Sequence, residues 1–255
     1  AAWLSGTVLQ PTPVPPELMA LVAGLLVALA PRLGWMLLVA GSAVLLTIGG
    51  LAGEALLLLL AGLIPPLLLP ARGMSWPLAA GALLLGGLGI AGGWPAVAAR
   101  AGSAWHRAAL GFAGWTWLFV AGELRGNGLY VRIAPGTPPR SVWSSSLYET
   151  THHVLSGPTT GRLLLLGVAW GCAAALLPMM RSRRSVVADA VLVLVWCALL
   201  AVAVVTIVGP VRGVASLIST HQLVIGMLAS AGIAIAFRAA SGWRLARRPE
   251  NGPVA

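Results

Sequence analysis

The sequence predicts an all-α, polytopic helical membrane protein with about eight transmembrane or re-entrant helices. Of its residues, 58% are hydrophobic and only 9% are charged, too few polar groups to cover a water-soluble surface. Residues 161–180 and 185–209 are apolar runs of about 20 residues, long enough to cross a ~30 Å hydrocarbon core as helices. Arg181, Arg183 and Arg184 lie between the two runs. Because basic residues in short loops resist translocation, we expect this connection on the cytoplasmic side.

The chain divides into three parts. Residues 1–16 are expected to be the end of a truncated helix followed by a proline-rich connector, which cannot be helical throughout. Residues 17–239 form the predicted membrane domain, and residues 240–255 a basic cytoplasmic tail. The apolar runs of the membrane domain are residues 17–30, 33–48, 51–69, 76–99, 104–124, 161–180, 185–209 and 223–237. The first two runs are short for a span, so they are either tilted spans or a re-entrant pair.

Counting outward from the arginine-bearing connection predicts that both chain ends are cytoplasmic. Arg100 and Arg107 then also face the cytosol, whereas Arg32, Arg72 and Arg212 fall in outer turns. The third run should kink or stop at Pro65-Pro66. Residues 125–160 become a long extracytoplasmic loop. The predicted location is the cell (plasma) membrane, with several passes through the lipid bilayer.

The strong positive charge has a topological explanation. The net charge of +10 arises from sixteen arginines against six acidic residues. On a soluble domain such a charge would suggest nucleic acid. Here the arginines lie at the ends of apolar runs, without basic stripes interleaved with aromatics, so no nucleic-acid partner is expected. Cys172 and Cys197 lie inside apolar runs and match no metal-ligand spacing.

The outer loop contains the main polar cluster. On a helix, Glu149 shares a face with His152 or His153, and Glu123 could approach them from the end of the fifth run. Residues 141–155 also contain apolar side chains at spacings that suit an amphipathic helix lying in the membrane interface. Two interpretations therefore remain. The segment is either an interfacial helix, or a site that senses a ligand or protons. No metal site is expected, because adjacent histidines cannot both face one ion from a regular helix.

Acidic residues near spans are candidates for ion pairs. Asp189 lies about one turn from Arg184 and could pair with it inside the membrane, or suit the first turn of its helix. Glu54 presents the same choice less clearly, since the edge of its run is uncertain.

Glycines in the apolar runs predict close helix packing rather than cofactor binding. Residues 87–92 match GxGxxG, but they lie within an apolar run with no preceding strand. The GxxxG spacings suggest helix contacts, including helix-mediated self-association. They occur at Gly49/Gly53, Gly89/Gly93 and Gly167/Gly171. No GxSxG, CxxC or paired carboxylates are present, so neither a catalytic site nor a cofactor is predicted in this chain.

Several stretches resemble the C-terminal transmembrane region of actinobacterial-type membrane serine/threonine protein kinases. They are residues 30–35, 65–70, 107–110, 123–126 and 177–181. The resemblance implies that a cytoplasmic kinase domain precedes this region, which anchors it and is a candidate sensor. The chain itself contains no lysine, HRD or DFG, so it cannot transfer phosphate, and whether the whole protein is an enzyme stays open. The alternative is a small transporter or permease-like membrane subunit, which would need polar groups lining a path.

Overall fold

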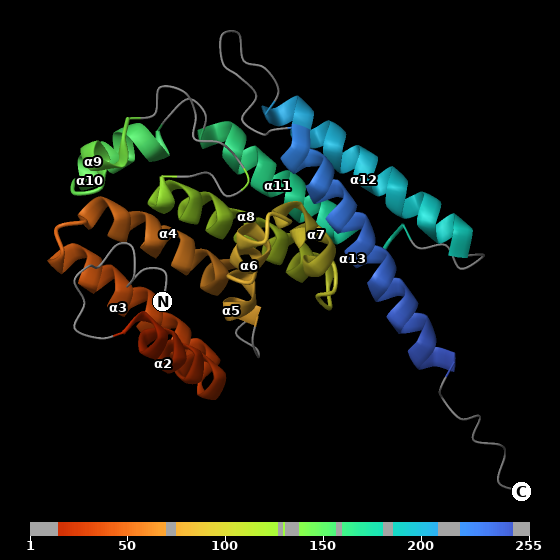
Figure 1. The fold of residues 1–255 in the computed structure, drawn as a ribbon, viewed down its shortest axis with the longest axis horizontal. Coiled ribbons are helices and arrows are strands. Elements are labelled where there is room, and N and C mark those ends of the chain that lie inside the picture. The colour runs from red at the N-terminus through yellow and green to blue at the C-terminus, as the bar shows by residue number, and fades with distance from the viewer. Residues whose placement is uncertain are drawn as a thin grey trace, which may run out of the picture.

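The computed structural model describes residues 15–69, 75–126, 130, 138–156, 160–180, 186–208 and 220–246. Every secondary-structure element in these ranges is a helix, which confirms the all-α prediction for this part of the chain. Figure 1 shows long helices side by side with shorter ones folded between them. They are α2 (Pro16–Leu29), α3 (Pro31–Ile48), α4 (Ala52–Leu68), α5 (Ser75–Ala79), α6 (Ala82–Gly87), η1 (Ala91–Gly93), α7 (Trp94–Ala98), α8 (Ala104–Arg125), α9 (Arg140–Trp143), α10 (Leu147–Glu149), η2 (Thr150–Leu155), α11 (Thr160–Leu176), α12 (Val186–Val208) and α13 (Thr220–Ala246).

Two of the described helices are long and apolar enough to cross a membrane. They are Pro31–Ile48 and Val187–Ile207. A third candidate is the bent pair Leu147–Leu155 and Thr160–Leu176, whose parts meet at 67°. Exposed leucines and valines cover much of these helices, as expected for lipid-facing surfaces. These helices make a helical membrane protein plausible, whereas the expected eight spans are not established by length and composition.

Residues 76–99 differ from the single span expected there. They form α5, α6, η1 and α7, four short helices that turn back on one another. Glycines produce the break: Gly89 adopts φ +73°, a left-handed conformation that side-chain-bearing residues rarely take. Pro95 then lies in the first turn of α7, where the missing N–H costs no helical hydrogen bond. Residues 91–96 of this segment are buried in the bundle, whereas Gly87, Leu88 and Gly89 at the break are exposed.

Glycines at helix crossings support the packing interpretation. A Cβ on Gly92 would lie 2.5 Å from the Cα of Gly226 in α13, and a Cβ on Gly171 would lie 2.7 Å from the carbonyl oxygen of Ala108 in α8. Ser230 of α13 also donates a hydrogen bond to the Gly92 carbonyl. The last glycine of the GxGxxG stretch, Gly92, therefore serves close approach to α13, whereas a Cβ at Gly87 or Gly89 would have no atom within 4 Å.

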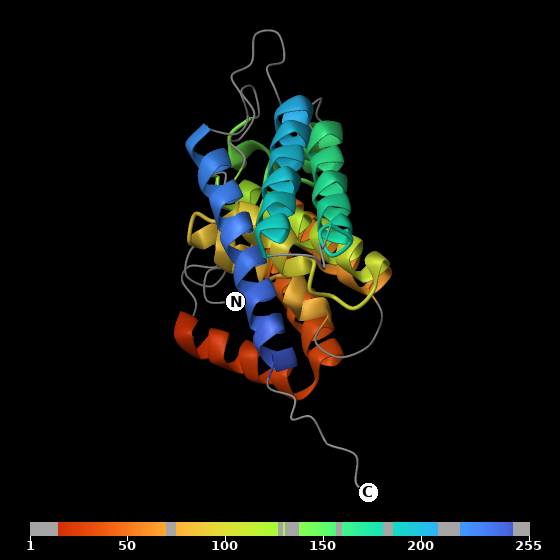
Figure 2. The ribbon, with the colours of Figure 1, turned by 90° about the vertical axis from the view of Figure 1, so that its right-hand side faces the viewer.

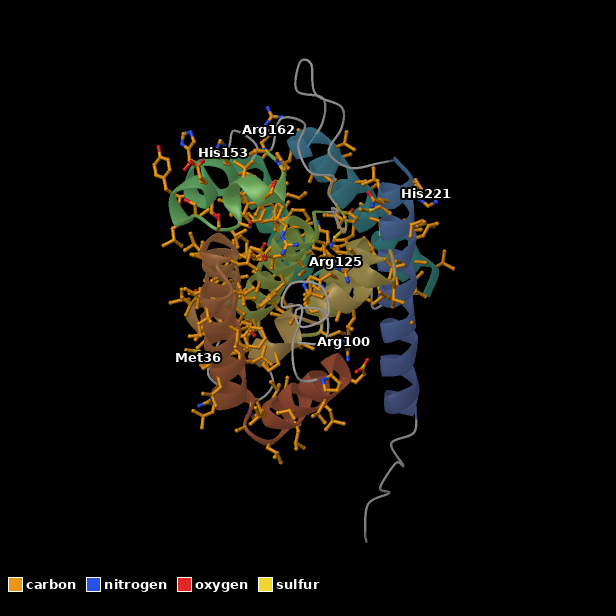
Figure 3. All side chains as sticks on the ribbon, turned by 60° about the vertical axis from the view of Figure 1, so that its left-hand side comes forward. Met36, Arg100, Arg125, His153, Arg162 and His221 are labelled. Atoms are coloured by element: carbon orange, nitrogen blue, oxygen red, sulfur yellow. The ribbon has the colours of Figure 1, made fainter. Side chains whose placement is uncertain are left out.

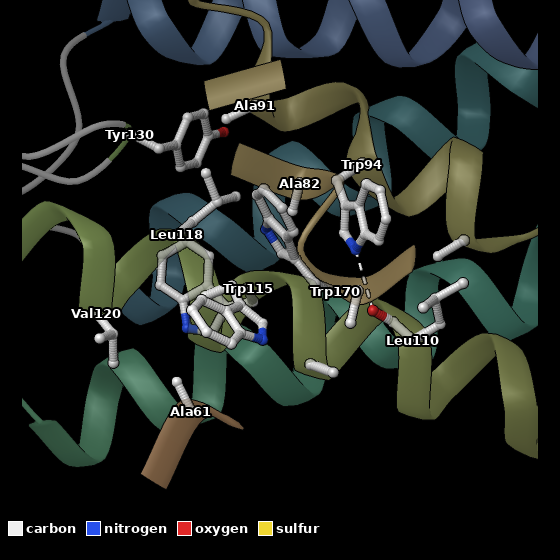
Figure 4. Close-up of a cluster of buried hydrophobic side chains, with 14 of the residues drawn as sticks. Ala61, Ala82, Ala91, Trp94, Leu110, Trp115, Leu118, Val120, Tyr130 and Trp170 are labelled. Carbon is white, nitrogen blue, oxygen red and sulfur yellow. Dashed lines mark hydrogen bonds between the residues drawn. The ribbon is translucent and has the colours of Figure 1, made fainter. Parts of the chain in front are cut away.

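Tryptophan side chains connect the helices by donating to main-chain carbonyls. An indole N–H has no water to bond within a membrane, so it needs a protein acceptor. The described residues contain six such bonds, five of which join segments at least 16 residues apart, and Figure 4 shows the one from Trp94 to Leu110. The donors and acceptors are Trp35 to Gly62, Trp76 to Leu69, Trp94 to Leu110, Trp105 to Leu68, Trp115 to Leu163 and Trp196 to Ala173, over 2.7–3.3 Å.

Three of these acceptors share a local feature. Four residues after Gly62 comes Pro66, which has no N–H to donate back to that carbonyl. Four residues after Leu110 and Leu163 come glycines, where a side chain would collide with the indole: a Cβ on Gly114 would lie 2.0 Å from Trp94 Nε1. A glycine or proline four residues after the acceptor thus leaves its carbonyl accessible to the indole N–H. α4 continues through Pro65-Pro66 and ends at Leu68, so the helix does not stop at the proline pair itself.

The hydrogen bonds also show which helix ends lie together. Trp35 near the start of α3 bonds to the last turns of α4, and Trp105 near the start of α8 bonds to Leu68 at the end of α4. The end of α11 lies there too, since Gly171 contacts Ala108. We call this the arginine end, because it contains Arg32, Arg100 and Arg107. Figure 3 shows Arg100 toward this end, away from His153 and Arg162.

The arrangement corrects one prediction about topology. Arg32 was expected on the opposite side from Arg100 and Arg107, but the structure gathers all three at one end. The reason is that the short helices from α5 to α7 return to the end from which they start. Arg72, Arg181, Arg183, Arg184 and Arg212 lie outside the described residues. The described residues that flank positions 70–74 and 181–185 belong to the arginine end.

Candidate functional site

Residues 138–156, which we call the polar segment, form the described part of the predicted outer loop. They contain α9, α10 and η2 rather than one amphipathic helix. Ser146 begins α10 by accepting a hydrogen bond from the Glu149 N–H at 3.3 Å. Thr150 then donates its hydroxyl to carbonyls of Trp143 and Ser146, each at 2.8 Å. η2 is a π-helix, a conformation that is rare and often found at functional sites.

Main-chain bonds attach the polar segment to the start of α4. The carbonyl of Ser144 accepts the N–H groups of Gly53 at 2.9 Å and Glu54 at 3.3 Å. These donors have no partner within α4, because the first N–H groups of a helix lack one. Position 53 must be glycine for this contact, since a Cβ there would lie 2.0 Å from Thr150 Oγ1 and 2.3 Å from the Trp143 carbonyl oxygen.

A buried ion pair strengthens the attachment. The Glu54 carboxylate is fully buried, and both of its oxygens accept hydrogen bonds from Arg140. The second of these bonds, from Nη2 to Oε2, measures 2.8 Å. A bidentate guanidinium is among the stronger partners that a buried carboxylate can have. The Arg140 side chain stays 31% exposed, so the pair lies between the helix bundle and the surface.

The predicted cluster of titratable residues lies on the outer face of this segment. His153 Nε2 is 3.0 Å from Glu149 Oε2, four residues earlier, and both side chains are about one-third exposed. The His152 ring stacks on Tyr148 with 3° between the ring planes and 5.9 Å between centroids. The two histidine rings meet edge to face at 5.1 Å. The structure therefore brings Glu149 and His153 together, and gives His152 a separate aromatic partner.

Glu123 does not complete a metal site with them. It lies in the last turn of α8, where its carbonyl accepts the Gly126 N–H at 3.0 Å. Across the described ranges, no three His, Cys, Asp or Glu side chains are grouped as a metal ion would require. Asp189 lies in the first turn of α12, the position favoured by the helix dipole, whereas its proposed partner Arg184 lies outside the described residues.

Tyr130 links the outer loop to the protein core. Its side chain is 3% exposed and packs edge-on against Trp115 of α8 and Trp170 of α11 (Figure 4). Burial raises the pKa of the Tyr130 hydroxyl far above its usual value, so the group stays neutral. Tyr130 is thus held between α8 and α11, which among the described helices pack most extensively against each other.

Sequence reasoning missed the partner of Glu54. Glu54 stands out as an acid near a span, but Arg140 is 86 residues away, with no local signal linking the two. Comparison with known protein families, with curated proteins and with solved structures finds no match for this chain.

Proposed function

We propose that this chain is a polytopic membrane domain whose polar segment senses conditions outside the cytoplasm, and that it anchors a serine/threonine kinase domain of the same polypeptide. One observation carries the sensing part: the contact between partly exposed Glu149 and His153 lies on a segment attached to α4 by a buried ion pair. A change at the surface therefore has a contact path to a helix of the bundle. The kinase part depends on the sequence resemblance.

The distribution of arginines supports a cytoplasmic arginine end. Arg32, Arg100 and Arg107 lie there, and the three arginines between α11 and α12 have flanking residues there. The positive-inside tendency favours this orientation. The polar segment then faces outward. In this proposal α5 to α7 form a re-entrant segment, and the crossing helices are α3, α4, α8, α11, α12 and α13.

The sensing proposal predicts a loss of pH response in a histidine variant. Histidine ordinarily titrates between pH 5 and 8, the range in which a surface His–Glu contact gains or loses its charge attraction. We expect autophosphorylation of the full-length protein to change over this range, and the response to disappear in His152→Ala/His153→Ala. The control is His221→Gln, an exposed histidine on α13 that should leave the response intact.

Two outcomes would contradict the proposal separately. An unaltered pH response in the double variant removes sensing by the histidines but leaves the anchor. A coding sequence that starts at residue 1, with no kinase domain in frame upstream, removes the anchor of a kinase but leaves the membrane fold.

A small transporter subunit is the second candidate, and the broken segment from α5 to α7 favours it. Discontinuous helices at membrane depth form the substrate sites of many transporters. A substitution at Ala91, which lies within this break and is 1% exposed, distinguishes the transporter from the anchor. In a transporter, Ala91→Cys should react with a water-soluble thiol reagent through the substrate path. In a closed anchor it should remain unreactive, and a lack of reaction would count against transport.

A further inference from the structure

The first described helix, α2, is too short to span a membrane. Its 14 residues extend about 21 Å, against a hydrocarbon core of roughly 30 Å. Figures 2 and 3 show it running across the arginine end of the bundle rather than along the other helices. Its last turn is held close to α3, because Gly34 has no side chain: a Cβ there would lie 2.5 Å from the Leu26 carbonyl oxygen.

Most of the α2 surface is apolar and uncovered. Large exposed side chains occur along its whole length, including Leu18, Leu21, Leu25 and Leu29, which are 52–77% exposed. Such a surface would be costly in water, since each buried leucine side chain gains about 1.5–3 kcal/mol. The charged residues are only at its ends, with Glu17 in the first turn and exposed Arg32 just beyond the last.

Neighbouring residues indicate the depth at which this helix lies. Trp105 is 62% exposed at the arginine end, and its indole donates to Leu68. Exposed tryptophans of membrane proteins concentrate at headgroup depth. Arg100 and Arg107 lie at the same end and add positive charge there. An apolar helix at such an end meets acyl chains on its sides and phosphates at its terminus.

We propose that α2 lies in the plane of the membrane at the boundary between headgroups and acyl chains, and that Arg32 binds the phosphate of anionic phospholipids there. The helix would contribute apolar contact area and Arg32 the preference for negative charge. This inference rests on the membrane location in the proposed function. It does not depend on the sensing role or on the kinase domain.

Depth measurement tests the first half of the proposal. A spin label is placed at Leu25→Cys in protein carrying Cys172→Ser and Cys197→Ala, reconstituted in lipid nanodiscs. Comparator labels at Leu194→Cys in α12 and Tyr148→Cys in the polar segment report the bilayer interior and the aqueous phase. We expect intermediate accessibility at position 25 to oxygen and to a water-soluble nickel complex. Accessibility equal to either comparator would overturn the in-plane position.

Thermal unfolding with the native cysteines tests the second half. Replacing phosphatidylcholine by phosphatidylglycerol in the nanodiscs should raise the Tm by about 2–4 °C, the size expected from one arginine–phosphate contact. Arg32→Gln should abolish this rise, whereas Arg162→Gln, at the other end of the bundle, should keep it. A rise that survives in Arg32→Gln, or no rise in the unaltered protein, would overturn lipid binding by Arg32. The histidine experiment above is independent of both results.

Discussion

At the scale of single residues, the Glu54–Arg140 pair attaches the polar segment to α4 through side chains. Glu54 is fully buried, and both of its carboxylate oxygens accept hydrogen bonds from Arg140. A buried carboxylate that loses its partner keeps the full cost of desolvation. Arg140 is partly exposed and can turn toward water when its partner is removed. The two single substitutions should therefore have unequal effects.

The prediction from this pair is an asymmetric mutant cycle. Arg140→Ala should reduce the free energy of unfolding by about 3–5 kcal/mol, because Glu54 stays buried without its partner. Glu54→Gln should cost less, and the double variant Glu54→Gln/Arg140→Met should be more stable than Arg140→Ala alone. Denaturant unfolding in detergent micelles measures each value. Arg162→Ala is the control for an arginine outside the pair, with an expected change within about 0.5 kcal/mol. Equal losses in both single variants would contradict the asymmetry.

At the scale of helices, α4 shows how a proline pair is accommodated inside an apolar helix. Pro65 and Pro66 remove the N–H groups that would bond to Ala61 and Gly62. Trp35 of α3 donates to Gly62 at 3.0 Å and so replaces one of the two missing donors. The same indole packs edge-on against Trp117 of α8. The bond joins α3 to α4 at the point where α4 is otherwise weakest.

The prediction at this scale is that one substitution suppresses another. Trp35→Phe should cost about 1–2 kcal/mol, because it leaves the Gly62 carbonyl buried without a donor. In a Pro66→Ala background the new N–H can bond to Gly62, so Trp35→Phe should cost clearly less there. Thermal unfolding of the four proteins measures the coupling. Trp196→Phe serves as the comparison, since its acceptor Ala173 also receives the Leu177 N–H at 3.1 Å. A Trp35→Phe cost that Pro66→Ala leaves unchanged would exclude the proposed replacement.

At the scale of the whole molecule, the return of α5 to α7 determines which arginines share an end. If residues 76–99 crossed the membrane once, Arg32 and Arg107 would lie on opposite sides. Because the segment turns back, Arg32 and Arg100, which precede α8, lie at the same end of the bundle as Arg107 in the first turn of α8. The turn of this segment, which includes Gly89 at φ +73°, therefore brings Arg32 and Arg107 to one end of the bundle.

Thiol labelling in cells tests this arrangement. The variants Gly102→Cys, Arg183→Cys and Tyr148→Cys are made in a Cys172→Ser/Cys197→Ala background and treated with a membrane-impermeant maleimide. A Cβ at position 102 has open space around it, so this substitution should not disturb the fold. We expect label at 148 in intact cells, and at 102 and 183 only in inside-out vesicles. Reaction at residue 183 from outside intact cells would overturn the outward-facing polar segment and the cytoplasmic anchor together.

The sequence alone determined the helical class, most helix positions and the spacing that brings Glu149 to His153. These follow from local properties, since apolar run length and four-residue spacing act within one helix. Only the tertiary structure decided that residues 76–99 turn back, that Arg140 is the partner of Glu54, and that tryptophans bond to carbonyls opened by glycine or proline. Each of these depends on contacts between residues far apart in the chain. Such contacts leave no periodic signal, because their free energy arises only when the helices pack.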